Sequence, residues 1–265
     1  MRLVSLASSS SGNCTYIGTE EVHILVDAGI SAKRIETGLA SLGLSPRDLS
    51  AVLVTHEHAD HIAGLGVLSR RYGIPIYTTH GTYGALLGSR STGRIPDGLH
   101  VPVEPDVWFK IGDINICPFH TDHDAAAPCA FRFEAGSAAA AVATDMGRYT
   151  DYTVEHLKGL NAIILEANHD VRMLEAGPYP YYLKQRILSD KGHLSNESSG
   201  RLLAEIISDR LCKVRLGHLS EQNNYAELAY ETVCCEITAS SAPFNGKDID
   251  IAVCDRLAMS DIINI

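Results

Sequence analysis

Short apolar runs separated by polar or glycine-containing turns dominate the first half of the chain, and this pattern is typical of strands. The predicted strands cover residues 3–6, 14–17, 22–26, 51–54, 75–77, 108–111, 114–119, 129–133 and 138–143. Turns at residues 112–113 and 136–137 contain glycine, so the last four runs are expected to form two hairpins.

Apolar positions at helical spacing predict helices between and after these strands. Ile35, Leu39 and Leu42 share one face of such a helix, which Ser31 can cap and Gly43 can end. The predicted helices cover residues 31–42, 62–72, 81–87, 150–157, 170–176, 181–188, 196–207 and 225–237, and further strands cover 162–166, 213–216 and 248–253. Residues 88–106 are rich in proline and glycine and are expected to form a surface excursion.

Two strand-rich stretches, each followed by helices, predict an α/β fold. The arrangement that fits is an αββα sandwich, in which two mixed β-sheets lie face to face with helices outside. No linker rich in proline or glycine separates two cores, and no internal repeat is visible. We therefore expect residues 1–265 to form a single domain.

Composition points to a soluble cytoplasmic protein. A hydrophobic content of 45% supports a core, while a net charge of −10 argues against a broad nucleic-acid-binding face. The chain has no apolar run of about 18 residues, and its start lacks the apolar core of a secretory signal. The cysteines are odd in number and form no C-x-x-C pair, so we expect small buried side chains in a reducing compartment. They are Cys14, Cys117, Cys129, Cys212, Cys234, Cys235 and Cys254.

The densest group of candidate metal ligands follows the apolar run 51–54. Residues 55–61, T-H-E-H-A-D-H, contain three histidines and two carboxylates, which are donors that suit divalent transition metals. Neither strand nor helix spacing brings all of them to one side, so we expect a loop. Such a loop can direct His56 and His58 to one ion, and Asp60 and His61 to a second. A solvated polar loop is the simpler alternative, but this density of donors disfavours it.

Other candidate ligands follow apolar runs elsewhere in the chain. Asp145 stands at a predicted strand end, where a carboxylate can bridge two ions about 3.5–4 Å apart. The third ligand of the first ion is His120 or His123, which side-chain chemistry alone does not separate. For the second ion the candidates are His193 and His218, of which only His218 directly follows a predicted strand.

The H-x-H-x-D-H pattern of residues 56–61 resembles the signature of metallo-β-lactamase-fold hydrolases. Further segments are similar to the WalJ (YycJ)-like branch of that family, and the similarity runs from residue 3 to about residue 235. These segments are S-S-S-G-N at 9–13, H-D-A at 123–125 with Pro128, T-D at 144–145, E-A-N-H-D at 166–170, G-H-L-S-N at 192–196, and H-L-S at 218–220 with N-N at 223–224. The resemblance implies the same αββα sandwich.

The resemblance also implies roles for the ambiguous histidines. The family pattern H-D-A falls on His123, which makes His123 the ligand. His120 is then a residue that contacts the ligands or lies on the substrate side. Ribonuclease Z-like relatives place their last ligand after a strand, which implies His218 and leaves His193 as a mobile pocket residue. Related phosphodiesterases hold a histidine beside the leaving group at the position of His169, so His169 is the first candidate proton donor and His193 the second. Either histidine could instead only form hydrogen bonds to the metal ligands.

Two divalent ions at such a site predict hydrolysis. They would activate a water molecule and orient substrate oxygens, while Asp60 could also accept a proton from the attacking water. Histidine and aspartate ligands without cysteine suit Zn or Mn, and Fe is possible. The WalJ-like resemblance implies a phosphodiesterase or nuclease acting on DNA, with 5′-to-3′ exonuclease activity.

Accessory residues favour a phosphodiester substrate. Hydroxyl and amide groups of the serine-rich loop could hold a phosphate oxygen, and cations could line the active-site face. The candidate substrate-binding residues are Ser10, Ser11, Asn13, Lys184 and Arg186, with Arg90, Arg94 and Lys191 as further cations. Tyr179, Tyr181 and Tyr182 lie beside this basic segment and could stack on bases, although packing is the more common role of such a cluster.

Three other functions remain as alternatives. A small-molecule hydrolase, acting on a cyclic nucleotide, lactone or thioester, would use the same ligands without a basic rim. A redox diiron protein would usually carry an acidic ligand in place of His58, so the histidine disfavours it. A non-catalytic metal-binding regulator is disfavoured because the ligand set looks complete.

Overall fold

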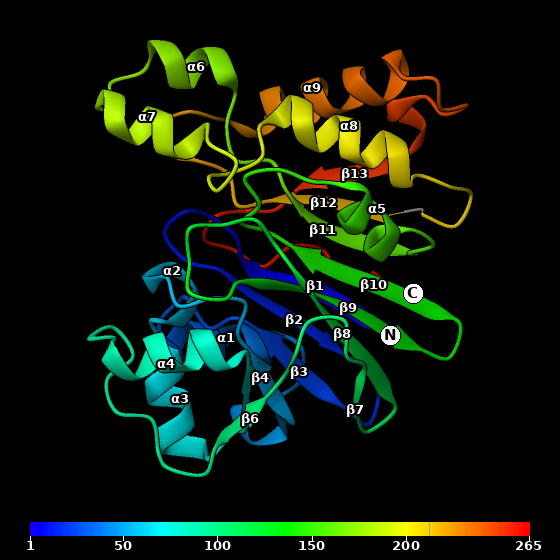
Figure 1. Ribbon diagram of the computed structural model, residues 1–265. Helices are drawn as coiled ribbons and strands as arrows, with labels where there is room; N and C mark the ends of the chain where they lie inside the picture. The colour runs from blue at the N-terminus through cyan, green and yellow to red at the C-terminus, as the bar shows by residue number, and fades with distance from the viewer. Residues whose placement is uncertain (212) are drawn as a thin grey trace.

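The computed structural model describes residues 1–211 and 213–265. Its strands form two sheets that lie face to face in the middle of the molecule, and its helices cover both outer faces (Figure 1). Both sheets contain parallel and antiparallel pairs. The predicted αββα sandwich of two mixed sheets is therefore confirmed.

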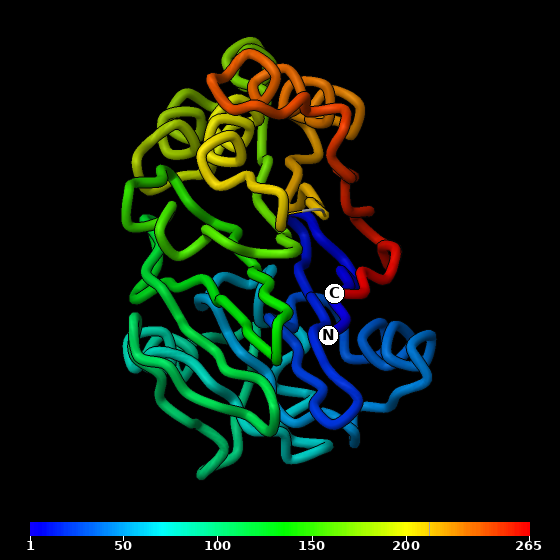
Figure 2. Tube along the Cα trace, turned by 90° about the vertical axis from the view of Figure 1, so that its right-hand side faces the viewer, coloured from blue at the N-terminus to red at the C-terminus, as the bar shows by residue number. Residues whose placement is uncertain are grey.

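The first sheet has the strand order β14-β1-β2-β3-β4-β5-β6. Strands β14 to β3 pair antiparallel, and β3 to β6 pair parallel. The strands are β1 (Arg2–Ala7), β2 (Cys14–Gly18), β3 (His23–Val26), β4 (Ala51–Leu53), β5 (Ile76–Thr78), β6 (His100–Pro102) and β14 (Ile263–Asn264). Since β14 pairs with β1, the two chain ends lie side by side (Figure 2).

The second sheet has the strand order β13-β12-β11-β10-β9-β8-β7. Strands β7 to β10 form the two predicted hairpins, and β10 to β13 pair parallel. The strands are β7 (Phe109–Ile111), β8 (Ile114–His120), β9 (Cys129–Ala135), β10 (Ala138–Ala143), β11 (Ala162–Glu166), β12 (Lys213–Gly217) and β13 (Asp250–Val253).

Helices begin where the sequence places capping side chains. The Ser31 side chain accepts a hydrogen bond from the backbone N–H of Arg34, and Ser195 accepts one from Ser198, as the pattern predicts. The α-helices are α1 (Ala32–Ser41), α2 (Ala59–Ile62), α3 (Leu65–Tyr72), α4 (His80–Gly88), α5 (Asp151–Leu157), α6 (Val171–Ala176), α7 (Tyr181–Ile187), α8 (Asn196–Ile206) and α9 (Ala226–Ala239).

The structure differs from the sequence prediction at α2, β6 and β14. The donor-rich segment was expected to be a loop, but Asp60 and His61 lie on the short helix α2. The predicted helix 62–72 is divided into α2 and α3 near Gly64, whose N–H donates to the carbonyl of Ala28 at 2.7 Å. Strands β6 and β14 have three and two residues, which are too few to give a hydrophobic pattern.

Three layers of apolar side chains hold the sandwich together. Leu3, Ile24 and Phe131 belong to the layer between the two sheets, and separate layers lie under α1 and α3 and under α5, α8 and α9. The predicted burial of the cysteines is confirmed for Cys14, Cys117, Cys129, Cys234 and Cys254, which are buried and free. It is wrong for Cys235, which is exposed on α9, and Cys212 lies outside the described residues. Within residues 1–211 and 213–265, every helix is too short or too polar to cross a membrane.

The parallel strands of both sheets point their carboxyl ends toward the same end of the sandwich. In open α/β sheets, functional side chains commonly lie beyond these strand ends. The segments that follow β4, β10 and β12 carry six of the predicted ligands, so the fold itself brings them together. They are His56, His58, Asp60, His61, Asp145 and His218.

Candidate metal centre

The first donor cluster combines side chains that follow strands of different sheets. His56 and His58 follow β4 of the first sheet, and His123 lies between β8 and β9 of the second. Their ligand atoms all lie within 4.8 Å of one another. Three imidazoles at this separation can bind one divalent ion.

The second donor cluster contains Asp60, His61 and His218, whose ligand atoms also lie within 4.8 Å of one another. Asp60 Oδ2 lies 3.4 Å from both His61 Nε2 and His218 Nε2. The two histidines are far apart in sequence, and His218 reaches the cluster because it directly follows β12.

Asp145 lies between the two clusters. Its Oδ2 is 3.3 Å from His61 Nε2, and its Oδ1 is 3.4 Å from His218 Nε2 and 3.8 Å from His123 Nε2. One carboxylate therefore approaches histidines of both clusters, which is the arrangement that a ligand shared by two ions requires.

Three residues at this end of the sheets have left-handed backbone conformations. Asp27, Asp145 and His218 have φ values of 60°, 61° and 57°. Such conformations are unfavourable for residues other than glycine and often occur at functional sites. Each residue lies one or two positions after a parallel strand, so the strain accompanies a sharp turn out of the sheet.

Hydrogen bonds fix the orientation of the histidine rings. In four of them Nδ1 has a partner outside the clusters, which leaves Nε2 facing the centre, as in many metal sites. The pairs are His56 with Thr55 Oγ1 (3.0 Å), His61 with Asp27 Oδ2 (2.7 Å), His123 with the carbonyl of Gly192 (2.9 Å) and His218 with Glu166 Oε1 (3.0 Å). His58 is reversed, since its Nδ1 lies 3.2 Å from His123 Nε2.

Two central atoms of the clusters lack hydrogen-bond partners among the described residues. His56 Nε2 and Asp145 Oδ2 are buried and accept or donate no hydrogen bond within the described part of the chain. Buried polar atoms are nearly always hydrogen-bonded, so atoms of this kind call for another explanation. A bound cation would satisfy both of them, and the donor set therefore fits a divalent metal.

The electrostatics of the clusters also favour a cation. Burial lowers the pKa of His218, but Asp145, Asp60 and Glu166 outweigh it and raise this pKa to about 10. For Asp145, burial raises the pKa, yet His218 and His61 hold it well below the usual range. Without a metal, protons on the rings must balance the buried carboxylates, and a divalent ion can replace those protons.

Glu166 is a functional residue that the sequence reasoning did not assign. It ends β11, is fully buried, and its Oε1 accepts from Nδ1 of His193 at 2.7 Å and of His218 at 3.0 Å. Its Oε2 accepts from the backbone N–H groups of Met146 and Leu194. Burial raises the pKa of Glu166, but His193 and the hydrogen bonds from His193 and His218 lower it to about 2, so the side chain is a carboxylate. Its place at a strand end was the available sequence signal.

Asp27 is a second residue that the sequence reasoning left without a role. Its Oδ2 accepts from His61 Nδ1 at 2.7 Å and from the Thr55 hydroxyl at 2.8 Å. Because Thr55 Oγ1 is also the partner of His56, Asp27 orients one histidine in each cluster.

Two predicted histidines, His120 and His169, belong to none of the groups of close donor atoms found among the described residues. The His120 side chain is 56% exposed and lies 3.8 Å from Asp122, whereas His123 is buried among the donors. His169 is buried, its Nδ1 pairs with Asn168, and its Nε2 has no hydrogen-bond partner among the described residues. Burial lowers the pKa of His169 to about 4, so its ring is neutral at neutral pH.

The serine-rich loop touches the centre through Asn13. Asn13 Nδ2 donates to Asp60 Oδ2 at 3.3 Å and lies 3.1 Å from His61 Nε2. Ser10 and Ser11 are exposed in the turn just before it. The loop therefore places one amide against the second donor cluster and two hydroxyl groups toward solvent.

The two predicted cations on α7 differ in position. Lys184 donates to the carbonyl of Glu175 at 2.7 Å, so its ammonium group is engaged between α6 and α7. Arg186 pairs with both carboxylate oxygens of Asp124. Asp124 Oδ1 lies 3.4 Å from His123 Nε2, which places Arg186 at the edge of the first donor cluster.

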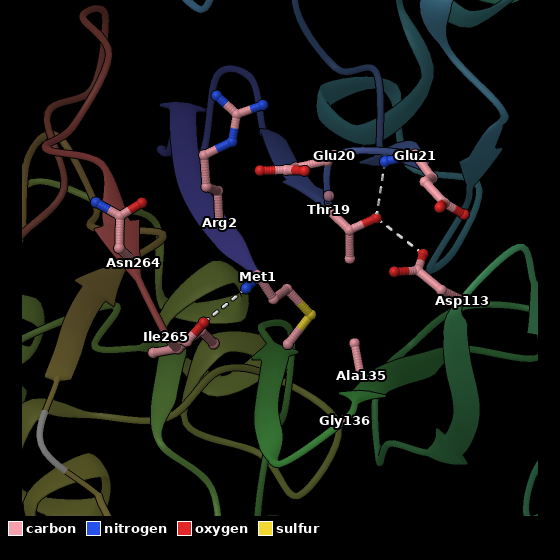
Figure 3. Close-up of a pocket in the computed structure, with 11 residues that line it drawn as sticks. Met1, Arg2, Thr19, Glu20, Glu21, Asp113, Ala135, Gly136, Asn264 and Ile265 are labelled. Carbon is pink, nitrogen blue, oxygen red and sulfur yellow. Dashed lines mark hydrogen bonds between the residues drawn. The ribbon is translucent and has the colours of Figure 1, made fainter.

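A cavity of about 800 Å³ lies at the opposite end of the sandwich (Figure 3). It is lined by Arg2, the turn at residues 18–21 before β3, Asp113 between β7 and β8, and Gly136 before β10. Asp113 precedes β8, which His123 follows, and Gly136 precedes β10, which Asp145 follows. The described lining residues include no histidine, so this cavity is separate from the metal chemistry.

Comparison with known proteins agrees with this geometry. Residues 23–214, more than half of the chain, match the model of the beta-lactamase superfamily domain. The chain is 40% identical over 250 residues to the exodeoxyribonuclease WalJ of Streptococcus pneumoniae serotype 2 (strain D39 / NCTC 7466), covering 94% of this chain and 92% of that protein. It is 42% identical over 228 residues to the exodeoxyribonuclease YycJ of Bacillus anthracis, covering 86% of each.

Solved structures share the fold at low sequence identity. The metallo-beta-lactamase fold protein YhfI from Bacillus subtilis superposes with a TM-score of 0.69 at 17% identity and covers 98% of both chains. Zn²⁺-bound PqqB from Methylobacterium extorquens gives a TM-score of 0.68 at 17% identity, covering 98% of this chain and 100% of that one. With its sandwich of two sheets and its histidine and aspartate clusters, the chain belongs to the beta-lactamase superfamily and has the metallo-β-lactamase fold.

Proposed function

We propose that this protein is a dinuclear metal-dependent phosphodiesterase that degrades DNA as an exonuclease. The observation that carries the proposal is the pair of donor clusters around Asp145, in which His56 Nε2 and Asp145 Oδ2 are buried without hydrogen-bond partners among the described residues. The relatives that are 40–42% identical over most of the chain are named exodeoxyribonucleases, which supports DNA as the substrate class.

In this proposal each donor cluster holds one divalent ion. His56, His58 and His123 would bind the first ion, and Asp60, His61 and His218 the second, with Asp145 shared between them. When bound, the ions supply Lewis acidity, which lowers the pKa of a water molecule and offsets charge on the reacting phosphate. Histidine and carboxylate ligands without cysteine favour Zn or Mn, with Fe possible.

The protein's own residues would position the reactants. Asn13 donates to Asp60 Oδ2, so this carboxylate is held in place to accept a proton from the attacking water. Asp27 holds the His61 ring, and Glu166 holds the His218 ring. These hydrogen bonds fix the geometry before substrate arrives, which reduces the cost of reaching the transition state.

His193 is better placed than His169 to donate a proton to the leaving oxygen. The His193 ring is partly exposed, and its Nδ1 pairs with the carboxylate of Glu166, which leaves Nε2 for a substrate. His169 is buried with a lowered pKa of about 4, so it carries no readily released proton near neutral pH.

The proposal is tested with DNA that is labelled at one end. The protein is loaded with Mn or Zn and incubated with single-stranded and duplex DNA carrying the label at the 5′ or the 3′ terminus. A 5′-to-3′ exonuclease releases the 5′ label at once as a short product and shortens the 3′-labelled strand progressively. The Asp145→Ala variant serves as the inactive control because it lacks the shared carboxylate.

The small-molecule alternative gives a different result in the same experiment. A hydrolase of cyclic nucleotides, lactones or thioesters would leave both labelled strands intact and would hydrolyse one of those compounds instead. Intact DNA with both metals would therefore overturn the nuclease proposal and leave a metal-dependent hydrolase as the function.

A further inference from the structure

Two adjacent aromatic side chains on α7 stand in solvent. Tyr181 and Tyr182 are 77% and 75% exposed, while Ile187 on the same helix is buried. Tyrosines that stabilise a fold by packing are largely covered, so packing does not account for this pair. Adjacent exposed rings can instead stack on planar groups of a ligand.

These rings are linked to the metal centre through one turn of helix. Tyr182 and Arg186 are four residues apart, so they lie on the same face of α7, about 5.4 Å apart along its axis. Arg186 pairs with Asp124, whose Oδ1 lies 3.4 Å from His123 Nε2. One helical turn and one carboxylate therefore separate Tyr182 from the first donor cluster.

This part of the chain does not share the acidic excess of the whole protein. Residues 170–191 contain four cations (Arg172, Lys184, Arg186 and Lys191) and three acids (Asp170, Glu175 and Asp190), a balance of 4 − 3 = +1. The whole chain has 22 − 32 = −10. Arg186 has five N–H donors, of which Asp124 accepts two, so the guanidinium group can also contact a phosphate.

We propose that Tyr181, Tyr182 and Arg186, here called the α7 ledge, bind a single-stranded segment of DNA beside the scissile phosphate. The tyrosine rings stack on bases, and Arg186 contacts the backbone between those bases and the metal centre. The inference rests on the proposed nuclease function and gives it a preference for single-stranded or frayed ends. Bases inside a duplex already stack on one another and are not available to the rings.

The test measures binding separately from cleavage. Metal-loaded protein is titrated against fluorescent single-stranded DNA with phosphorothioate linkages, which resist hydrolysis, and the dissociation constant is read from anisotropy. Tyr182→Ala is compared with Tyr182→Phe, which keeps the ring. Trp108→Ala is the matched control, because Trp108 is also an exposed aromatic residue but precedes β7, far from α7 (Figure 1).

If the α7 ledge binds DNA, Tyr182→Ala should raise the dissociation constant by a factor of about five or more. Stacking of one base on an aromatic ring contributes about that factor to the affinity. Tyr182→Phe and Trp108→Ala should stay close to wild type. The inference would be overturned by an unchanged dissociation constant in Tyr182→Ala or by an equal loss of affinity in Tyr182→Phe. It would also be overturned if the wild-type protein did not bind the DNA. A changed oligomeric state of the DNA-free Tyr182→Ala protein would overturn it too, because it would identify α7 as an interface between chains.

Cleavage of ordinary DNA by the wild-type protein separates the two proposals. Binding through the α7 ledge without cleavage would refute the nuclease function and retain the ledge. If the wild-type protein cleaves DNA and Tyr182→Ala binds it as tightly as wild type, the nuclease function is retained and the α7 ledge is refuted.

Discussion

Four of the five histidines in the donor clusters direct one ring nitrogen to the centre and pair the other with a group outside the clusters. Their Nδ1 atoms pair with Thr55, Asp27, Gly192 and Glu166. These partners come from four separate segments: the turns after β4 and β3, the loop between α7 and α8, and the end of β11. A ring held in this way binds a metal through a nitrogen of fixed position. The site therefore depends on these partners as well as on the ligands themselves.

The choice between His120 and His123 can be tested by metal content. His123→Ala removes a buried donor from the first cluster and should release about one equivalent of metal and abolish turnover. His120→Ala changes an exposed side chain and should leave the occupancy nearly intact. Elemental analysis of both purified variants gives the answer, and the reverse pattern would show that the ligand assignment is wrong.

Glu166→Gln should lower kcat by about 10- to 100-fold, as loss of a group that orients metal ligands commonly does. The amide cannot accept from both His193 and His218 while also receiving two backbone N–H groups. Glu175→Gln is the control because Glu175 is exposed on α6. Steady-state rates on DNA are compared with metal content, and an unchanged kcat in Glu166→Gln would contradict the role of this carboxylate.

Metal binding should release protons and strengthen as pH rises. Burial lowers the pKa of His218, but Asp145, Asp60 and Glu166 raise it to about 10 in the metal-free protein, so the ring is protonated at pH 7. A metal binds only the neutral ring, and the proton must leave. Between pH 7 and about 10 the dissociation constant should therefore fall, by about tenfold per pH unit for one released proton. Calorimetry in buffers of different ionisation enthalpy measures this release, and a pH-independent constant would exclude it.

At the level of elements, local patterns predict most of the fold. Strands such as β8 and β10 and helices capped by Ser31 or Ser195 are encoded within a few residues, and they lie where the sequence indicates. The short strands β6 and β14 form only because a neighbouring strand pairs with them. In the same way, the roles of Asp27 and Glu166 depend on contacts between distant strand ends, which no local pattern contains.

A glycine substitution tests how closely α2 packs on the turn after β3. A Cβ at Gly29 would lie 1.6 Å from the carbonyl oxygen of Asp60, so Gly29→Ala must displace α2. We expect a loss of about 1–3 kcal/mol in the free energy of unfolding, as for other overpacked sites, and weaker metal binding. Gly84→Ala on α4 has no atom within 4 Å and should stabilise the helix by about 0.5–1 kcal/mol. Urea unfolding of both variants is the measurement, and equal effects would contradict the close packing.

At the level of the whole molecule, the proposed function requires a negatively charged protein to bind DNA, which is also negatively charged. The net charge of −10 allows this if cations near the centre act locally, and α7 carries Lys184 and Arg186. The apolar layer between the sheets is shared by strands from both halves of the chain, which supports the proposal of a single domain. The cytoplasmic location stays a prediction from composition.

Salt should separate a DNA substrate from a small one. Phosphate contacts release counterions, so kcat/KM on single-stranded DNA should fall by about tenfold or more between 50 and 200 mM salt. Hydrolysis of bis(p-nitrophenyl) phosphate, which has a single charge, should change little over the same range. Equal salt dependence for the two substrates would argue against a DNA-binding surface around the centre.

The number of ions that the folded protein retains tests the dinuclear centre most directly. Protein reloaded with Mn or Zn and freed of excess metal is analysed for metal per chain, beside the Asp145→Ala variant. Two clusters sharing Asp145 predict about two ions per wild-type chain and fewer in the variant. A properly folded wild-type protein that retains no metal would contradict the account.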